Sequence, residues 1–392
     1  MSLLGFEYKW WIRMDYLVIG CGLTGSVIAR HLAEKGERVT IWERRNHIGG
    51  NMYDYVDDNG ILVHKYGPHV FHTDSEAESI YMKQYGSWVD FPIKCRVNML
   101  GKVTPSPFNF QTIDDYYSSK DAECLKSELL REYKNRDKVT IVELLQSHNA
   151  VVREYADFLF KHDYSLYTAK QWGMRPEDVD PSILKRVPVL LSYKDGYFDD
   201  KWQMVPCDGY TEWFKELLSH TNIRVELNTE ALDRISIICD AVYLDGELFH
   251  GVVIYTGPID ELFNKKYGAL PYRSLEFAWK TVNEHQHLPA ALVAYPEAEG
   301  YTRITEYNHF PQKDKKDVSS LAFEYPVMYE EGIQMEPYYP LLTTESLRKY
   351  ELYEAEADSI TNLVVAGRLA KFKYYNMNQA LTAALEVAES IQ

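Results

Sequence analysis

Short apolar runs flank one helical pattern near the start of the chain. Residues 16–19 form an apolar run, residues 23–35 carry apolar side chains at helical spacing, and residues 39–42 form a second apolar run. This succession is typical of a β-α-β unit. We interpret residues 1–13, which precede Met14, as an upstream start or an added extension and leave them out of the fold argument.

From about residue 113 to residue 180 the pattern becomes helical. Val151, Tyr155, Phe158 and Leu159 are expected on one buried helix face. Two prolines and a polar, glycine-containing run follow, which is too irregular for a helix and too long for a tight turn. We therefore predict a helical domain with a mobile substrate loop at about residues 181–198.

The second half of the chain alternates between β-rich and α/β patterns. Runs at residues 223–227 and 251–255 resemble buried strands, and later runs indicate an antiparallel sheet, at residues 277–282, 291–295, 301–307 and 319–324. A strand at 362–366 and a helix from about Asn378 return to α/β. The expected fold is α/β, with a discontinuous Rossmann-like domain, a helical insert and an antiparallel β-sheet domain. The expected ranges are 14–85, 220–262 and 346–392 for the nucleotide-binding domain, 110–200 for the helical domain, and 86–109, 201–219 and 263–345 for the sheet domain.

The amino-acid composition limits the kinds of molecule that the chain is expected to bind. The 392 residues carry a formal net charge of −16, which disfavours nucleic acid because binding to phosphate backbones depends on lysine and arginine. The five cysteines are scattered, so we expect no metal site and a reducing, cytoplasmic location. No apolar run is long enough to span a membrane.

Gly20, Gly22 and Gly25 stand at G-x-G-x-x-G spacing between the first expected strand and helix. Glycines there permit a tight turn and a close approach of the backbone to a pyrophosphate. Glu43 ends the second expected strand 18 positions after Gly25, where an acid can bind ribose hydroxyls. This pattern predicts a dinucleotide site for either NAD or FAD.

The residues after Glu43 favour FAD. Arg44, Gly49, Gly50 and Asn51 resemble the segment that FAD-binding oxidoreductases carry after the ribose acid. Near the other end of the chain, a strand ends at Gly367 and a helix begins soon after, as in flavoproteins that direct a helix dipole towards the flavin ring. A second glycine fingerprint for a nicotinamide domain is not visible.

Many short motifs then occur in order along the chain. They are HKYGPHVFHT (64–73), YTAKQWG (167–173), KRVPV (185–189), YTGPID (255–260), ALPYRSL (269–275), YTRITE (301–306), EPYYP (336–340) and GRLAKFKYYNMNQ (367–379). Together they resemble bacterial UDP-galactopyranose mutases.

The resemblance implies an isomerase that interconverts UDP-galactopyranose and UDP-galactofuranose, a precursor of cell-surface polysaccharide. In this family FAD is active when reduced, and it acts as a nucleophile at the anomeric carbon with no net redox change. The expected partners are UDP-galactose, an external reductant such as NAD(P)H, and a second copy of the chain in a homodimer.

The resemblance also assigns site residues. Arg186 and Arg303 match two arginines that clamp the diphosphate, and a guanidinium suits phosphate oxygens geometrically. The expected aromatic contacts to the substrate come from Tyr167, Trp172, Tyr197, Tyr339 and Tyr374.

Around the cofactor, His69 matches a histidine near the flavin that assists proton transfer or tunes the flavin. His72 is a weaker candidate for the same place. Arg368 matches an arginine beside the flavin, and Met377 is expected to contact the cofactor as well.

Two positions depart from the family pattern. Leu190 stands where many relatives carry a second loop arginine, and Asn376 replaces the acid of a K-Y-Y-D motif. Two other functions stay open at this stage. One is a flavin oxidase of amine-oxidase type, and the other is a non-catalytic protein that binds FAD or a nucleotide sugar.

Overall fold

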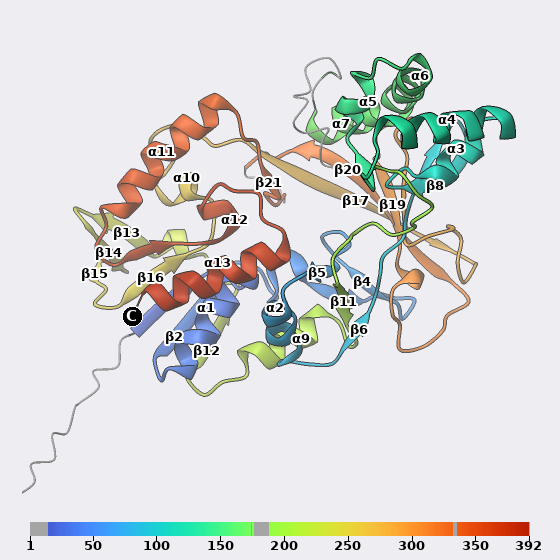
Figure 1. The fold of residues 1–392 in the computed structure, drawn as a ribbon. Coiled ribbons are helices and arrows are strands. Elements are labelled where there is room, and N and C mark those ends of the chain that lie inside the picture. The colour runs from blue at the N-terminus through green and yellow to red at the C-terminus, as the bar shows by residue number, and fades with distance from the viewer. Residues whose placement is uncertain (1–14, 174, 176–187, 332–334, 392) are drawn as a thin grey trace, which may run out of the picture. The chain divides into compact units, whose positions relative to one another are not determined.

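The computed structural model describes residues 15–173, 175, 188–331 and 335–391 (Figure 1). The chain divides into two compact units. Unit 1 comprises Met1–Gly50, Phe214–Leu270 and Leu342–Gln392, and unit 2 comprises Asn51–Trp213 and Pro271–Leu341. The expected division into three domains, with a separate helical domain, stays a prediction.

Unit 1 contains a parallel sheet of five strands in the order β12-β2-β1-β16-β22. The strands are β1 (Asp15–Ile19), β2 (Arg38–Glu43), β12 (Ile223–Leu227), β16 (Val252–Tyr255) and β22 (Leu363–Val365). The chain fills one side of β1 first and then crosses to the other side, so the carboxyl end of β1 is a topological switch point. In parallel sheets of this kind ligands bind at that point. The expected Rossmann-like topology is confirmed.

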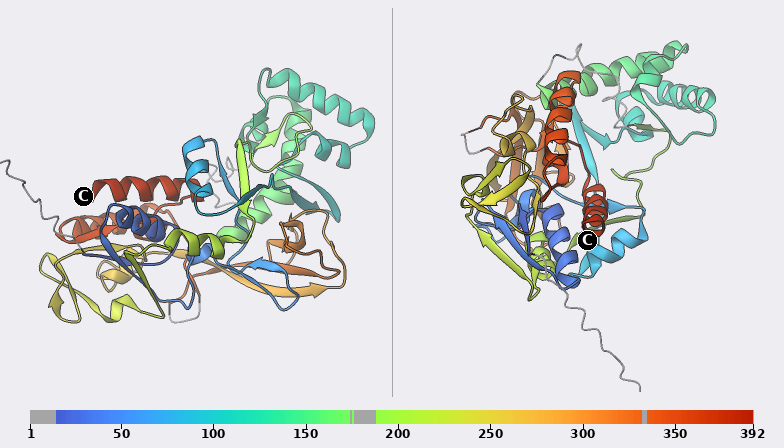
Figure 2. Two further views of the ribbon diagram at one scale, coloured as in Figure 1. Left: turned by 90° about the horizontal axis from the view of Figure 1, so that it is seen from below. Right: turned by 90° about the vertical axis from the view of Figure 1, so that its left-hand side faces the viewer.

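Helices accompany this sheet within unit 1. The last helix, α13, packs along α1 (Figure 2). A small hairpin sheet of β13, β14 and β15 was not expected from the sequence. The elements are α1 (Leu23–Glu34), η4 (Ala231–Asp233), β13 (Ile235–Ile238), β14 (Ala241–Leu244), β15 (Glu247–Leu248), α10 (Ile259–Leu262), α11 (Thr344–Asp358), α12 (Gly367–Ala370) and α13 (Met377–Ser390).

Unit 2 is built on a sheet of seven strands in the order β21-β17-β20-β19-β18-β7-β8. Its neighbouring pairs are antiparallel except for β18 and β7, which run parallel. The expected antiparallel sheet is confirmed. The strands are β7 (Cys95–Met99), β8 (Lys102–Ser106), β17 (Tyr272–Val282), β18 (Leu292–Ala294), β19 (Arg303–Glu306), β20 (Ser319–Met328) and β21 (Tyr339–Pro340).

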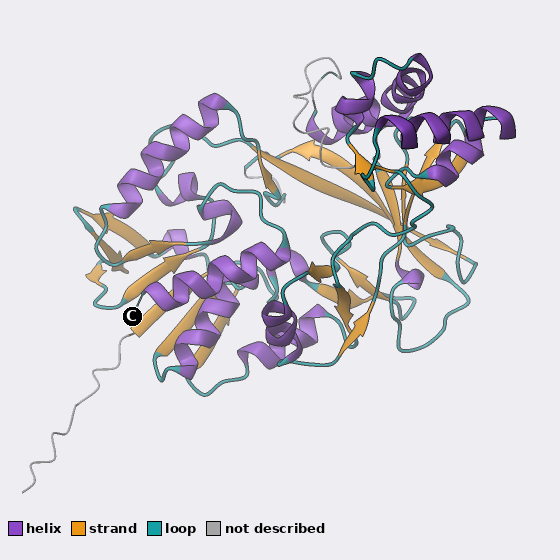
Figure 3. Cartoon of the chain, viewed as in Figure 1, coloured by secondary structure: helices purple, strands orange, loops and turns teal. Residues whose placement is uncertain are grey.

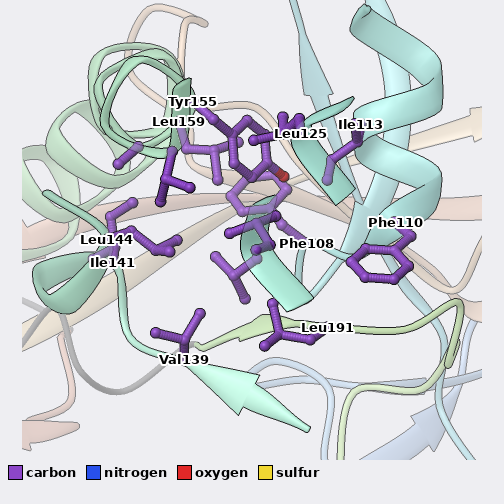
Figure 4. Packing of buried hydrophobic residues seen from close by; sticks show 14 of the residues in the cluster. Phe108, Phe110, Ile113, Leu125, Val139, Ile141, Leu144, Tyr155, Leu159 and Leu191 are labelled. Carbon is purple, nitrogen blue, oxygen red and sulfur yellow. The ribbon is translucent and has the colours of Figure 1, made fainter. Parts of the chain in front are cut away.

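The helical insert gathers at one end of this sheet (Figure 3). It contains α3 (Phe110–Tyr116), α4 (Ser119–Glu132), α5 (Ile141–Leu145), α6 (Ala150–Leu159), the π-helical turn η2 (Phe160–Tyr164) and α7 (Ser165–Trp172). Their apolar side chains form one core with Phe108 and Leu191 (Figure 4).

The buried face of α6 differs from the expected one. Tyr155 and Leu159 are buried as expected, but Val151 is 41% exposed and Phe158 is only partly buried. Val152 and Ala156 complete the buried face instead. The sequence pattern was therefore assigned one residue too early, because neighbouring apolar positions fit helical spacing almost equally well.

Shorter elements complete unit 2. They are η1 (Gly50–Met52), which begins at the end of unit 1, β3 (Asp54–Val56), β4 (Leu62–His64), β5 (Phe71–Thr73), α2 (Glu76–Lys83), β6 (Trp88–Asp90), β9 (Lys138–Val139), β10 (Val189–Leu190), β11 (Trp202–Pro206), α9 (Tyr210–Leu218), which ends in unit 1, and η5 (Tyr307–His309). In the described part of the chain no helix combines the length and apolar character needed to cross a bilayer.

The expected substrate loop is described only from Pro188 onwards. Within it, β10 pairs with β9, and Leu190 is buried. Leu190 is therefore a core residue, which explains an apolar side chain at this position. The mobility of residues 181–198 stays a prediction.

Candidate functional site

The glycine fingerprint forms a tight turn that requires glycine at Gly20 and Gly25. A Cβ atom on Gly25 would lie 2.1 Å from the Gly20 carbonyl oxygen, and one on Gly20 would lie 2.1 Å from Thr256 Oγ1. Gly20 also has a φ of +104°, a conformation that other residues rarely adopt. The turn places the amino end of α1 directly after β1, where helix amides bind phosphate.

A second glycine contact lies beside this turn. A Cβ on Gly50 would lie 2.8 Å from Gly22 Cα, whereas a Cβ on Gly22 would meet its nearest atom, Gly50 Cα, at 3.8 Å. The structure thus brings together two residues that were expected to bind the cofactor from different parts of the sequence. Asn51, the next predicted cofactor residue, lies in η1.

Glu43 is buried at the end of β2, and both of its carboxylate oxygens are oriented by the backbone. The amide of Cys21 donates to Oε2 at 2.8 Å, and the amide of Arg45 donates to Oε1 at 2.9 Å. A carboxylate has about four acceptor sites, so these two bonds leave capacity for ribose hydroxyls. Burial raises the pKa of the neighbouring Cys21 thiol to about 12, which keeps it protonated. Arg44 forms a long ion pair with Glu261, with 3.8 Å between Nη1 and Oε2.

The C-terminal segment of unit 1 holds further predicted residues together. The Arg368 guanidinium lies 5.5 Å from the ring centre of Tyr374 and donates a hydrogen bond to the Tyr375 carbonyl. Met377 is the first residue of α13. Gly367, with a φ of +89°, comes close to Thr24 on α1, because a Cβ there would lie 3.2 Å from Thr24 Oγ1.

In unit 2, Arg303 is held by a carboxylate that sequence reasoning missed. Glu324 Oε2 accepts from Arg303 Nε at 2.8 Å and lies 2.7 Å from Nη2. Burial by itself would lower the pKa of Arg303, but the Glu324 carboxylate and two tyrosines raise it well above its usual value. The arginine is therefore a permanent cation with a fixed orientation. Glu324 is 1% exposed, and its Oε1 finds no hydrogen-bond partner within the described residues.

Two predicted substrate tyrosines lie near this pair, and a third lies near one of them. Tyr167 and Tyr339 interact electrostatically with Arg303, and Tyr167 also interacts with Tyr197. Burial raises the pKa of Tyr167 above its usual range despite the nearby arginine, so its hydroxyl stays a neutral donor. Unit 2 thus brings together four of the predicted substrate residues.

The histidines of the HKYGPHVFHT segment have different surroundings. His69 Nδ1 lies 2.8 Å from the Gly67 carbonyl, so it carries the proton, and the His69 amide donates to His64 Nδ1 at 3.0 Å. Burial lowers the pKa of His64 to about 3, so His64 is a neutral acceptor that orients the His69 backbone. His72 lies 3.0 Å from Asp200 and stacks on Phe198.

Two predicted residues are not fully placed. Arg186 lies outside the described residues, so its role in the diphosphate clamp stays a prediction. Trp172 is the last residue of α7.

Comparisons with known proteins add to this geometry. A family model described as UDP-galactopyranose mutase matches residues 162–374, and a model described as an NAD(P)-binding Rossmann-like domain matches residues 18–83. The chain is 32% identical over 398 residues to UDP-galactopyranose mutase of Mycoplasma pneumoniae, with 100% of both chains covered. The chain belongs to the UDP-galactopyranose mutase family, a family of isomerases.

Relatives in this family carry more than one name. The dTDP-fucopyranose mutase of Escherichia coli is 33% identical over 376 residues, which cover 95% of this chain and 97% of that protein. A probable UDP-galactopyranose mutase of Klebsiella pneumoniae is 33% identical over 377 residues, which cover 96% of this chain and 94% of that protein. Family membership therefore leaves the nucleotide and the sugar to be argued separately.

Solved structures agree on the fold. A crystal structure of reduced UDP-galactopyranose mutase matches with a TM-score of 0.72 at 16% identity, covering 97% of this chain and 94% of that one. A putrescine oxidase variant matches with a TM-score of 0.56 at 13% identity, covering 97% and 98%. At this identity the match with the oxidase shows a shared fold alone.

Proposed function

We propose that this chain is an FAD-dependent UDP-galactopyranose mutase that interconverts UDP-galactopyranose and UDP-galactofuranose. The observation that carries the proposal is the arrangement around Arg303. A permanent cation oriented by a buried carboxylate, with two tyrosines beside it and a third beside one of them, suits the diphosphate of a nucleotide sugar.

The residues of unit 1 fit FAD. Gly20 and Gly25 leave no room for a side chain, and because Gly22 has none either, a pyrophosphate can approach the backbone of α1. Glu43 presents an oriented carboxylate to ribose hydroxyls, and Arg368 supplies a cation. When bound and reduced, FAD would supply a nucleophile for the anomeric carbon, in a reaction with no net transfer of electrons.

The residues matched to the family's substrate motifs bind and orient the substrate. Arg303, and Arg186 from the loop, bind the diphosphate and stabilise the charge that develops on the leaving UDP. Tyr197, Tyr339 and Tyr374 donate hydroxyl hydrogen bonds to the diphosphate, while Tyr167 and Trp172 border the uridine and the sugar. The unpaired Glu324 Oε1 is an acceptor for a ligand hydroxyl, because a buried carboxylate oxygen without a donor is unfavourable.

His69 is proposed to hold or move a proton of the sugar. Its Nδ1–H donates to the Gly67 carbonyl, so the acceptor lone pair is on Nε2. The enzyme also requires an external reductant such as NAD(P)H and acts as a homodimer in this proposal. Light scattering of the purified protein measures the second point.

The decisive assay compares dithionite-reduced and oxidised protein with UDP-galactofuranose. We expect the reduced protein to form UDP-galactopyranose over many turnovers without consuming reductant, and the oxidised protein to bind UDP-galactose without converting it. Product that tracks reductant one for one would contradict the proposal, and so would equal turnover by the oxidised protein.

The substrate is tested in the same assay. The name of the Escherichia coli relative makes dTDP-fucopyranose the competitor to test, because it differs from UDP-galactopyranose in the base, in the ribose 2′-hydroxyl and in one hydroxyl of the hexose. Faster turnover of dTDP-fucopyranose and dTDP-fucofuranose would indicate that this chain is a dTDP-fucopyranose mutase. Oxidation of putrescine with consumption of oxidant would instead indicate an amine oxidase, and binding without turnover a non-catalytic protein.

A further inference from the structure

Lys170, on α7, has its ammonium group surrounded by backbone carbonyl oxygens. Nζ donates hydrogen bonds to the carbonyls of Tyr295 at 2.7 Å, Ala298 at 2.8 Å and Tyr301 at 2.9 Å. An ammonium group has three N–H donors, so all of them are used here. The three acceptors lie in the connection between β18 and β19, and Lys170 therefore binds α7 to that connection.

The main chain of the same helix turn is held from another strand. Arg273 on β17 donates from Nε to the Gln171 carbonyl at 3.1 Å and from Nη2 to the Lys170 carbonyl at 3.4 Å. Arg273 is buried, and a cation at the carboxyl end of a helix is electrostatically favourable. The end of α7 is thus attached to the sheet through both a side chain and the backbone.

These attachments bear on the Arg303 site. Tyr167 lies one helical turn before Lys170 on the same face of α7. Arg303 begins β19 two residues after Tyr301, whose carbonyl accepts one of the three lysine bonds. The lysine therefore links the segment that carries Tyr167 to the segment that carries Arg303.

We propose that Lys170 is a positioning residue: its ammonium group holds α7 against the β18–β19 connection, so that Tyr167 stays beside Arg303 in the geometry that binds the diphosphate. The choice of UDP as the ligand rests on the proposed function.

This arrangement depends on pH. The groups that face Lys170 are Asp163 from η2, Arg273 from β17, and Tyr295 and Tyr301 from the β18–β19 connection. Burial lowers the pKa of Lys170 to about 8 against the influence of Asp163, and burial raises the pKa of Asp163 to about 7. Burial also raises the pKa values of both tyrosines, which stay neutral in this range. Above pH of about 8 the neutral amine has two donors for three carbonyls.

Affinity and stability should then respond to pH with opposite signs. Between about pH 8 and the usual lysine pKa, the unfolded chain keeps the proton that the folded chain has lost. The contribution of Lys170 to the free energy of unfolding therefore rises with pH in this interval. The hydrogen bonds that position Tyr167 weaken over the same interval, so UDP affinity falls. A lysine that stabilised only the fold would give the same rise in stability with pH but would leave UDP affinity unchanged.

The experiment measures UDP binding by calorimetry and unfolding by urea at pH 7 and pH 9. The variants are Lys170→Met, Lys170→Arg and the matched control Lys161→Met, which removes an exposed lysine of the adjoining turn η2. UDP affinity of the unmodified protein should fall by up to about tenfold across this range, the effect of one charge-assisted hydrogen bond. Lys170→Met should bind UDP weakly at both pH values, Lys170→Arg should lose the pH dependence, and Lys161→Met should match the unmodified protein.

Two results would overturn the inference. One is an unchanged pH dependence of UDP affinity in Lys170→Met, and the other is a UDP affinity in that variant equal to that of Lys161→Met. Hydrogen exchange of residues 165–172 gives a measure without ligand, and faster exchange in Lys170→Met than in Lys161→Met is expected. If the unmodified protein does not bind UDP, the proposed function fails. Equal hydrogen exchange in Lys170→Met and Lys161→Met would overturn the positioning role whether or not UDP binds.

Discussion

The glycine turn of unit 1 and the Arg303 cluster of unit 2, the two phosphate sites proposed here, are built in different ways. In unit 1 the contacts are prepared by backbone, because Gly20, Gly22 and Gly25 remove side chains from the end of β1. In unit 2 they are prepared by side chains, with Arg303 held by Glu324 across two strands.

The glycine turn is formed mainly by residues close together in the sequence, whereas the Arg303 cluster is formed by residues from different strands. The glycine turn lies within one β-α-β unit and has a close neighbour outside it, Thr256 after β16, so a mutation there should affect mainly the turn and its ligand. The Arg303 cluster depends on an ion pair buried in the sheet, so a mutation there should affect both the ligand and the sheet.

The largest effect is expected at the buried pair. Arg303→Met leaves Glu324 as a buried charge without its partner, and we expect a loss of about 3–5 kcal/mol in the free energy of unfolding together with loss of UDP binding. Adding Glu324→Gln removes the orphaned charge, so the double variant should recover much of the stability but none of the binding. Urea unfolding and calorimetry measure these quantities. A double variant less stable than Arg303→Met would contradict this account.

A smaller effect is expected at the glycine turn. Gly25→Ala places a Cβ 2.1 Å from the Gly20 oxygen and should lower the stability of the FAD-free protein by about 1–3 kcal/mol. Gly22→Ala is the matched control, because its Cβ meets only Gly50 Cα, at 3.8 Å. It should leave the stability of the FAD-free protein nearly unchanged but weaken FAD retention. Equal losses of stability in the two variants would contradict the view that Gly25 is needed for the turn and Gly22 for the ligand.

Glu43 should affect the cofactor more than the fold. Glu43→Gln replaces one acceptor oxygen by an amide that faces the backbone N–H of Cys21 or Arg45, so FAD affinity should fall by roughly tenfold, the effect of about one hydrogen bond to a charged group. The ratio of flavin to protein absorbance after dialysis measures retention. Glu386→Gln, an exposed change in the same unit, should retain FAD normally.

The smallest effect concerns the departure at Asn376. Asn376 is the N-cap residue of α13, and its backbone amide donates to Gln379 Oε1 at 2.9 Å. Asn376→Asp adds a negative charge at a helix amino end and should stabilise unit 1 by about 0.3–1 kcal/mol. A thermal midpoint that falls in Asn376→Asp would show that the acid is unfavourable in this chain.

The sequence by itself determined the dinucleotide-binding fold and most of the glycine turn between β1 and α1. The apolar runs, the glycine spacing and the position of Glu43 all lie within one short stretch of sequence. The structure forms β1, α1 and β2 over that stretch. Such features follow from local backbone geometry, which a short segment encodes without help from the rest of the protein. The motifs likewise led to the family that the comparisons show.

Tertiary structure decided which groups act together in unit 2. Glu324 meets Arg303 because β19 and β20 pair in a register that places these two residues directly opposite each other, and a slip of one residue would place Phe323 or Tyr325 there instead. The acceptors of Lys170 are main-chain carbonyls, which every residue possesses and no sequence pattern marks. Partners of these two kinds depend on strand pairing and on how a helix packs against a sheet, so they become visible only when the chain is folded.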